Sequence, residues 1–557
     1  MSSKKKSPDM SGPGVLGRLR HPSPRGKLFA FAAVSVLSAL YLTGSTIWNG
    51  RDLLPKSHDE HSYAIQTQMI ARGKLWMPQH ELADFFESFQ MLARPVYASI
   101  YFPGSALMYA PGVWLSLPPW VMPVLVSGLS AGLSYLLATR LIDGLAGLLV
   151  ALLLLASHWF RMNATLVMSQ SPMMVLGLGI LLASLRWREG KDVKWAALIG
   201  ACAGWAAIVR PVDALAFAIP IGVAMLLDFR RLPLRRVAIT CAIVIVAAVP
   251  FLSLQLALNK GTTGSFTRAP HTLYLQTDQP NTTYGFHAYD PHARPQSKLL
   301  QKQIYYRNFM LPDVQKHRPD RIVHSALERL MLTVDVALST KLLLVLVIAG
   351  LFNLTDAPRR VIAAVPLVFF LLYLPYTFYM EHYVLPIVPP ILLLVVLGAQ
   401  RIAAMWKEPA AKRKAERVMV AVLVVVALAS LPEVNPRVRD DRMFGTTSTI
   451  IRSFVRPRVT APAVVLVRYR EDENPHDEPV YNSNVAWPDE AAIILAHDLG
   501  PRNMEIIEYF ARMEPQRRFY LFDRDKLLQR KDLPLRELGT AGELALRLRA
   551  AATQPVP

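Results

Sequence analysis

The chain is dominated by apolar runs of about 20 residues, which as helices are long enough to cross about 30 Å of hydrocarbon. Hydrophobic residues make up 52% of its 557 residues, too large a share for an ordinary soluble protein of several domains. We therefore predict an all-α polytopic membrane bundle of about 11 transmembrane helices. The first run covers residues 28–47, and the others begin near Trp120, Leu145, Ser171, Trp195, Val212, Val237, Leu338, Val361, Val384 and Val418.

The N-terminus resembles a secretory signal because a basic leader, residues 1–27, precedes the first run. The run lacks a small-x-small cleavage site and is long enough to span, so we predict a retained anchor. Both cysteines, Cys202 and Cys241, fall in apolar runs, and we expect neither a disulfide nor a zinc site from them. The spacing of Gly200 and Gly204 is typical of close helix packing.

The charge is strongly basic, with 61 Lys and Arg against 41 Asp and Glu, a balance that could indicate nucleic-acid binding. The basic residues lie instead in alternate connections between apolar runs, so we expect no nucleic-acid partner. The positive-inside rule places these connections and the N-terminus in the cytoplasm, with the bundle in the cytoplasmic (inner) membrane. The connections hold Arg186, Arg188, Lys191 and Lys194; Arg230, Arg231, Arg235 and Arg236; Arg359 and Arg360; and Lys407, Lys412, Arg413, Lys414 and Arg417.

This orientation divides the chain into a leader, a transmembrane domain over 28–433 and an outer domain over 434–557. Two long loops of the transmembrane domain, 48–119 and 259–337, also face outward. The apolar stretch 104–117 contains a proline, and counting it as a span would invert the downstream loops, so we predict an interfacial or re-entrant helix.

The last domain changes character, with short β-branched runs in place of long apolar ones. Runs at 463–467, 492–495 and 519–522 indicate strands, and the pattern at 503–513 is helical. We therefore predict a small extramembrane α/β domain.

The first outer loop begins with a polar cluster at residues 57–63. Ser57 and Glu60 have the spacing of a capping box, and spacing alone favours this structural interpretation over a catalytic one. His58 and His61 are three residues apart, which would suit a metal, but no further ligands are evident nearby.

Several short motifs resemble, in combination, the GT-C membrane glycosyltransferases, closest to the protein O-mannosyltransferase and aminoarabinose transferase group. The acidic pair Asp59-Glu60 follows the first span, then Tyr63 and a helix that closes at Gly73 and Pro78. The remaining motifs are Phe102-Pro103-Gly104, Val209-Arg210-Pro211, His382-Tyr383-Val384-Leu385-Pro386, Val480-Tyr481-Asn482 and His497-Asp498-Leu499-Gly500.

The resemblance implies that Asp59 is the catalytic carboxylate and that Glu60 completes the acidic pair. Members often carry a second acidic residue in the loop after the third span, but here residues 166–172 contain no carboxylate. A second acid would have to come from elsewhere, such as Asp84 or Glu87. Many members also have a basic residue at the position of His382.

The resemblance further implies a polyprenyl-phosphate sugar as donor, and the chemistry is consistent with the residues present. Such a donor has a good leaving group, so the enzyme needs cations for the phosphate and a carboxylate for the acceptor's proton. Arg210 is the strongest candidate cation, since a charge between apolar segments costs about 2.5–3.5 kcal/mol without a partner. The full predicted set for the donor phosphate is Arg94, Arg210, Arg268, His382 and Tyr383.

We therefore expect a hexosyl or pentosyl transferase that inverts the sugar, with Asp59 as catalytic base, at the outer membrane face. The acceptor would be a lipid, a glycan or a protein, and no cofactor is expected, with a divalent metal not indicated. The alternatives are a secondary transporter and a non-catalytic membrane subunit of an envelope assembly complex. Transporters carry ionisable residues near the midplane and two related halves, and neither feature is seen.

Overall fold

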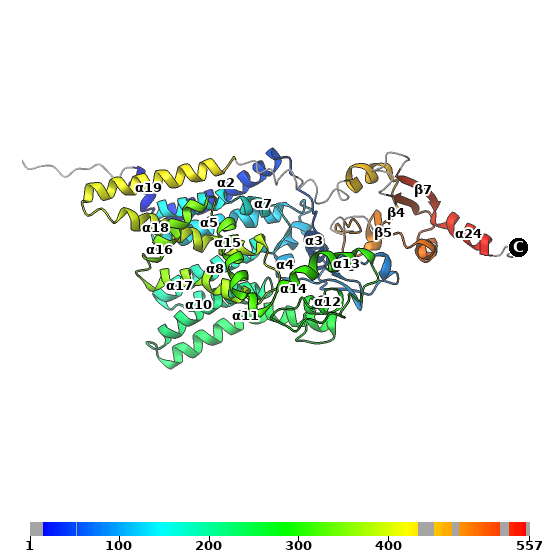
Figure 1. Cartoon of the computed structure of the whole chain (residues 1–557), viewed down its shortest axis with the longest axis horizontal. Coiled ribbons are helices and arrows are strands. Elements are labelled where there is room, and N and C mark those ends of the chain that lie inside the picture. The colour runs from blue at the N-terminus through cyan, green and yellow to red at the C-terminus, as the bar shows by residue number, and fades with distance from the viewer. Residues whose placement is uncertain (1–14, 52, 433–449, 470–477, 524–533, 553–557) are drawn as a thin grey trace, which may run out of the picture.

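The computed structural model describes residues 15–51, 53–432, 450–469, 478–523 and 534–552. A bundle of helices fills one side of the molecule and a small sheet lies at the other, with the loop helices between them (Figure 1). The helices of the bundle are α2 (Pro24–Trp48), α5 (Val121–Leu141), α6 (Gly144–Ala156), α7 (His158–Asn163), α8 (Gln170–Gly190), α9 (Val193–Ala207), α10 (Pro211–Phe229), α11 (Leu234–Thr263), α15 (Ile322–Ala337), α16 (Leu344–Leu351), α17 (Ala357–Tyr373), α18 (Val388–Ala403) and α19 (Pro409–Ser430).

Each predicted apolar run forms a helix. Among the described residues, five helices are long and apolar enough to cross a membrane, or six if the pair around 319–351, bent by 107°, is one span. Others are shorter, with 13 residues in α6 and 15 in α9. The structure therefore shows a polytopic membrane protein, while the number of about eleven spans stays a prediction.

The helices pack closely where the sequence provides small residues. A Cβ atom on Gly200 would lie 2.2 Å from the carbonyl oxygen of Val244, and one on Gly204 would lie 2.7 Å from Cα of Ala248. Any larger side chain would push α9 away from α11. The small-residue spacing thus has the packing role predicted from the sequence.

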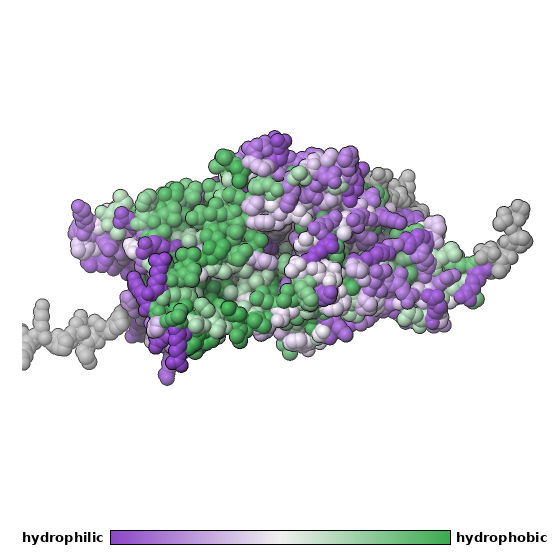
Figure 2. Space-filling view, turned by 90° about the horizontal axis from the view of Figure 1, so that it is seen from below, coloured by the Kyte–Doolittle hydropathy of each residue, from purple (hydrophilic) through white to green (hydrophobic). Residues whose placement is uncertain are grey.

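A belt of apolar side chains covers the outside of the bundle (Figure 2). Large hydrophobic residues are exposed on its outermost helices, among them Phe29 on α2 at 77% exposure and Val246 on α11 at 68%. In water such a continuous apolar surface would be unfavourable, whereas lipid chains solvate it. Hydrophilic side chains lie at both ends of this belt.

One end of the bundle, hereafter the basic end, collects the basic connections. Ion pairs link them there: Asp228 contacts Arg188 at 3.0 Å and Lys191 at 2.6 Å, and Arg140 pairs with Glu189. The short helix α1 (Val15–Arg20) also lies at this end. The basic connections that alternate with non-basic ones in the sequence therefore do lie together at one end of the bundle.

The opposite end carries the two long loops. The first loop forms α3 (His58–Ala71), α4 (Gly104–Trp114) and a three-stranded antiparallel sheet of order β1-β3-β2. At 11 residues α4 is too short to span, in keeping with the interfacial prediction. The strands are β1 (Met77–Pro78), β2 (Met91–Leu92) and β3 (Val96–Ser99), and the second loop forms α12 (Pro270–Asp278), α13 (Leu300–Tyr305) and α14 (Leu311–Lys316).

The C-terminal residues form a four-stranded sheet of order β5-β4-β6-β7. Strand β4 pairs in parallel with both β5 and β6, and its first five residues are buried because it lies inside the sheet. The predicted strands and helix are thus present. Their bounds are β4 (Ala463–Arg468), β5 (Ile493–His497), β6 (Arg518–Asp523), β7 (Leu535–Thr540), α22 (Asn503–Met513) and α24 (Ala541–Ala552).

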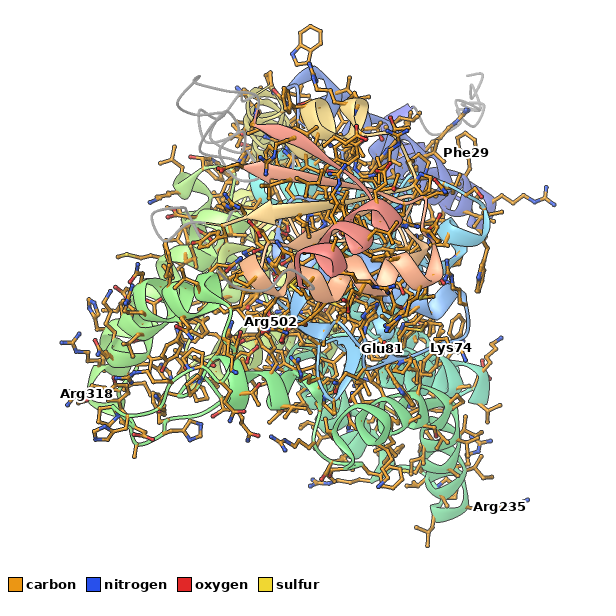
Figure 3. All side chains as sticks on the ribbon, turned by 90° about the vertical axis from the view of Figure 1, so that its right-hand side faces the viewer. Phe29, Lys74, Glu81, Arg235, Arg318 and Arg502 are labelled. Atoms are coloured by element: carbon orange, nitrogen blue, oxygen red, sulfur yellow. The ribbon has the colours of Figure 1, made fainter. Side chains whose placement is uncertain are left out.

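This sheet domain packs directly on the first loop. Phe85 and Phe86 of the loop share an apolar cluster with Val464 and Phe510. At the border, Nη1 of Arg502 donates to the Asp84 carboxylate at 2.8 Å, and Arg502 is seen in Figure 3 beside the helices of the domain. The sheet domain therefore holds the first loop in place over the bundle.

Candidate active site

Helix α3 begins at the capping box predicted from the sequence. The Ser57 hydroxyl accepts a hydrogen bond from the Glu60 amide at 3.3 Å, and the Glu60 carboxylate accepts one from the Ser57 amide at 3.3 Å. The other oxygen of Glu60 accepts from the amide of Val167 at 3.4 Å. Glu60 is only 3% exposed, and it links the start of α3 to the loop before α8.

The capping box fixes the first turn of α3 so that Asp59, the residue before Glu60, faces the inside of the protein. Its Oδ1 accepts a hydrogen bond from the Tyr101 hydroxyl at 2.5 Å. Burial raises the pKa of Asp59 above its usual value, although the bond from Tyr101 and the positive charge of Arg210 act in the opposite direction. A carboxylate with a raised pKa at a polar boundary is a candidate general base.

A close approach of two backbone segments brings Tyr101 toward Arg210. The Gly104 amide donates to the carbonyl of Ile208 at 2.7 Å, and Trp205 Nε1 donates to the Gly104 carbonyl at 2.8 Å. A Cβ atom at Gly104 would lie 2.6 Å from the Ile208 oxygen. The motifs at 102–104 and 209–211, distant in sequence, therefore meet at one place.

Arg210 stands immediately before α10, and its guanidinium is largely enclosed. Its Nε donates to Asp213 at 2.6 Å, its Nη1 to the Ser169 hydroxyl at 3.2 Å and its Nη2 to the Tyr373 hydroxyl at 3.0 Å. Tyr373 in turn donates to Asp213. Of the five N–H groups of a guanidinium, three are engaged in this way, which leaves donors for a ligand.

The motif at 382–386, far from Arg210 in the sequence, lies next to it in the structure. The guanidinium of Arg210 lies 4.6 Å from the ring centroid of Tyr383, a cation–π distance. His382 packs its ring edge-on to Tyr383 at 4.6 Å. Four predicted site residues, Asp59, Arg210, His382 and Tyr383, therefore gather at the boundary between the bundle and the loops.

Aromatic rings from three segments surround His58, next to Asp59. The His58 ring stacks on Phe89 at 4.3 Å, and Tyr305 packs against Phe89 at 5.1 Å. His58 Nδ1 and the Tyr481 hydroxyl share a hydrogen bond of 2.9 Å, so the sheet domain contributes to this wall. Burial and, to a smaller extent, the charge of Asp59 raise the pKa of Tyr305, which keeps its hydroxyl protonated.

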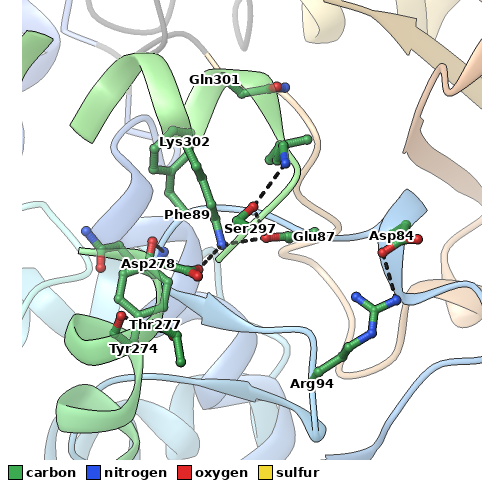
Figure 4. A network of polar contacts seen from close by, with 12 residues as sticks. Asp84, Glu87, Phe89, Arg94, Tyr274, Thr277, Asp278, Ser297, Gln301 and Lys302 are labelled. Carbon is green, nitrogen blue, oxygen red and sulfur yellow. Dashed lines mark hydrogen bonds and ion pairs between the residues drawn. The ribbon is translucent and has the colours of Figure 1, made fainter. Parts of the chain in front are cut away.

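A buried ion cluster connects the two long loops (Figure 4). Lys302, only 3% exposed, contacts Glu87 at 3.0 Å and Asp278 at 2.6 Å. Burial would lower the pKa of Lys302, but its anionic neighbours raise it above the usual value, so the ammonium stays charged. The carbonyl of Glu87 also bonds to His497 of the sheet domain at 2.6 Å. Three parts of the chain are thus held together.

Two predicted phosphate ligands lie elsewhere. Arg94 is exposed and pairs with Asp84 at 2.7 Å, and Arg268 donates to Gln276 at 2.5 Å. Within the described part of the chain, neither contacts Asp59 or Arg210. The acids suggested as a second carboxylate, Asp84 and Glu87, are likewise engaged in ion pairs.

Sequence reasoning missed Tyr101 and Tyr373 and did not assign Asp213 to the site. Tyr101 directly precedes the motif at 102–104, so its position was the available signal. Tyr373 lies in an apolar helix, where an aromatic residue has no distinguishing pattern. Over the residues that the structure describes, no group of three or more His, Cys, Asp or Glu side chains could hold a metal ion.

Comparisons with known proteins give matches among solved structures only. No family model matches the chain, and no curated protein matches it at a significant level. The chain is similar to ArnT (aminoarabinose transferase) from Cupriavidus metallidurans in the apo state, with 14% identity, a TM-score of 0.50, and coverage of 92% of this chain and 97% of that one. The structure of the same protein bound to undecaprenyl phosphate gives 14% identity and a TM-score of 0.51, covering 92% and 96%.

A third match is an oligosaccharyltransferase from Archaeoglobus fulgidus, in complex with Zn and sulfate. It has 12% identity and a TM-score of 0.45, and the match covers 72% of this chain and 53% of that one.

The chain therefore has the fold of the ArnT structures over nearly its whole length. This shared fold agrees with the architecture implied by the resemblance that the motifs indicated.

Proposed function

We propose that the chain is a membrane glycosyltransferase that uses a polyprenyl-phosphate-linked sugar as donor. The observation that carries the proposal is the proximity of Asp59, fixed by Tyr101, to the enclosed guanidinium of Arg210. A base and a phosphate ligand close enough to interact electrostatically, at the membrane boundary, are what this transfer requires. The fold shared with an ArnT structure bound to undecaprenyl phosphate supports the same donor class.

Arg210 would bind the donor phosphate. Asp213, Ser169 and Tyr373 hold three of its N–H groups, so the fork is oriented before the ligand arrives. The remaining donors match a phosphate oxygen, and the partial neutralisation by Asp213 limits the cost of enclosing the charge. Tyr383 under the guanidinium and His382 beside it would complete this side of the site.

Asp59 would act as general base in a direct displacement. Its carboxylate takes the proton of the acceptor hydroxyl while the acceptor oxygen bonds to the anomeric carbon. The bond from that carbon to the phosphate oxygen breaks, and polyprenyl phosphate leaves with the electron pair, its charge balanced by Arg210. Attack opposite the leaving group inverts the sugar. The proton on Asp59 then passes to water.

Glu60 would support the reaction through structure. Its oxygens bind backbone amides at the start of α3 and at Val167, so it fixes the position of Asp59 without facing the acceptor. Glu60 is thus proposed as a positioning residue.

The positive-inside rule assigns the basic end to the cytoplasm, so the site would face outward from the cytoplasmic membrane. The N-terminus would then be inside and the sheet domain outside. A lipid, glycan or protein hydroxyl would be the acceptor, and the sugar would be a hexose or a pentose.

The test compares two variants of the purified protein. Asp59→Asn removes the basic oxygen, so the release of polyprenyl phosphate from a panel of polyprenyl-phosphate hexoses and pentoses should fall about 10²- to 10⁴-fold. Binding of undecaprenyl phosphate should be unchanged. Arg210→Met should lose that binding, whereas Arg210→Lys, which keeps the charge without the fork, should weaken it.

Arg94→Met is the matched control, since Arg94 is an exposed arginine paired with Asp84, away from the site. It should leave both measurements unchanged. Normal turnover in correctly inserted Asp59→Asn protein would refute the catalytic assignment, and unchanged undecaprenyl phosphate binding in Arg210→Met would refute the phosphate site.

A further inference from the structure

A polar cavity lies at the basic end of the bundle, on the opposite side from Asp59. It has a volume of about 330 Å³ and is bounded by α1, α6, α18 and α19. Pockets that hold small ligands have volumes of about 300–1,000 Å³, so the cavity can take a headgroup-sized molecule. None of its lining residues has a part in the proposed transfer.

The cavity has an excess of positive charge. Its charged lining residues are Arg20, Arg359, Arg401, Lys412, Asp143 and Glu416. Both carboxylates are already used: Asp143 caps α6 by accepting from the Ala146 amide at 2.8 Å, and Glu416 accepts from Arg20 at 3.4 Å.

The remaining cations of the cavity are Arg359, Arg401 and Lys412, and they differ in whether they already have partners. Arg359 pairs with Asp356 at 3.2 Å and donates to the Leu141 carbonyl at 3.3 Å, so it is already bound at the start of α17 and the end of α5. Within the described ranges, Arg401 and Lys412 form no ion pair and no side-chain hydrogen bond, and both reach solvent. They are therefore available to an anion.

The other side of the cavity is apolar. Leu149, Val396 and Leu423, which belong to the buried core of the bundle, line it together with the partly buried Val420. On the same helix as Val420, the side chain of Val425 is 64% exposed. A ligand that fills the whole cavity would thus need an anionic head and an apolar tail.

We propose that this cavity binds the headgroup phosphate of an anionic phospholipid from the leaflet at the basic end. Arg401 and Lys412 would contact the phosphate, the guanidinium through its fork and the ammonium as a point charge. The acyl chains would lie along the apolar wall and the outer face of α19. Basic pockets between transmembrane helices at the cytoplasmic surface are a known setting for such headgroups.

Native mass spectrometry of the purified full-length protein in detergent provides the test. Phosphatidylglycerol should be retained more tightly than phosphatidylcholine with the same acyl chains. The double variant Arg401→Gln, Lys412→Gln should weaken phosphatidylglycerol binding about 10- to 30-fold, because each surface cation contributes modestly and the two act together. The double variant Arg413→Gln, Lys414→Gln is the control, since it removes the same charge from exposed positions of α19 outside the cavity.

Three results would overturn the proposal. Equal retention of both lipids by the unmodified protein would do so without any variant. Equal weakening in the control would indicate general attraction to the basic end, and complete displacement by millimolar inorganic phosphate would assign the cavity to a free anion. The measurement is independent of sugar transfer.

Discussion

The hydrogen bond from Tyr101 to Asp59 gives the sharpest prediction about the proposed base. Tyr101→Phe removes one hydroxyl and keeps the ring, which stacks on Tyr63 at 4.3 Å. The bond, 2.5 Å long, favours the ionised form of Asp59, whereas burial favours the neutral form. Losing the hydroxyl therefore raises the pKa of Asp59 further.

The expected change in the pKa of Asp59 follows from the strength of the hydrogen bond from Tyr101. Hydrogen bonds to charged groups contribute about 1.5–3 kcal/mol, and one pKa unit corresponds to about 1.4 kcal/mol. The expected increase is thus about 1–2 units. A general base works when deprotonated, so activity is present above the pKa of Asp59 and is lost as the pH falls through it. The acidic limb of the pH–rate profile should therefore move upward by about 1–2 pH units.

The assay is the release of polyprenyl phosphate as a function of pH. Well above the limb, the rate of Tyr101→Phe should stay close to that of the unmodified protein. Tyr97→Phe is the control, because Tyr97 is buried in β3, the strand just before Tyr101, and among the described residues its hydroxyl forms no hydrogen bond to Asp59. A uniform loss of rate at all pH values, with the limb unmoved, would show that Tyr101 acts by packing and would refute the reasoning.

The remaining predictions concern stability and topology. Ser57→Ala should lower the stability of the folded protein by about 0.5–2 kcal/mol, measured by denaturation in detergent. Turnover per folded molecule should stay near normal, because the bonds of Glu60 to the Ser57 and Val167 amides remain and still position Asp59. Lys302→Met should cost about 3–5 kcal/mol, because it leaves two carboxylates without their buried cation, whereas Lys298→Met at an exposed position should change little. In a cysteine-free background, Ala288→Cys should react with a membrane-impermeant thiol reagent in intact cells and Ala410→Cys should not; the reverse pattern would invert the topology. The outer position 475, an equivalent choice on sequence grounds, lies outside the described residues.

The two predicted roles of the first loop illustrate what spacing can and cannot distinguish. Ser57 and Glu60 do form the capping box, as local spacing favoured. The same cap also orients Asp59, so the structural and catalytic interpretations of this segment are compatible. Asp59 lies in α3, whereas Tyr101 follows β3, and only their contact in the folded structure shows where the Asp59 carboxylate points.

The residues predicted to bind the donor phosphate show the same limit. Arg210 was singled out as a charge between apolar segments that needs partners, and the structure gives it three. Arg94 belonged to the same predicted set, yet it is exposed and paired with Asp84. Whether an arginine in a loop is enclosed depends on which distant segments cover it.

The sequence by itself determined the membrane bundle, the gathering of basic connections at one end and the strands of the sheet domain. These features depend on local composition, because the length and apolarity of a run decide its partition into lipid and its periodicity decides its secondary structure. The tertiary structure alone decided that Asp59, Arg210 and Tyr383 meet, that Lys302 joins both loops, and that Arg401 and Lys412 share a cavity with an apolar wall. Contacts between residues far apart in the chain depend on the close approach of helices and loops, such as that at Gly104, which no local pattern encodes.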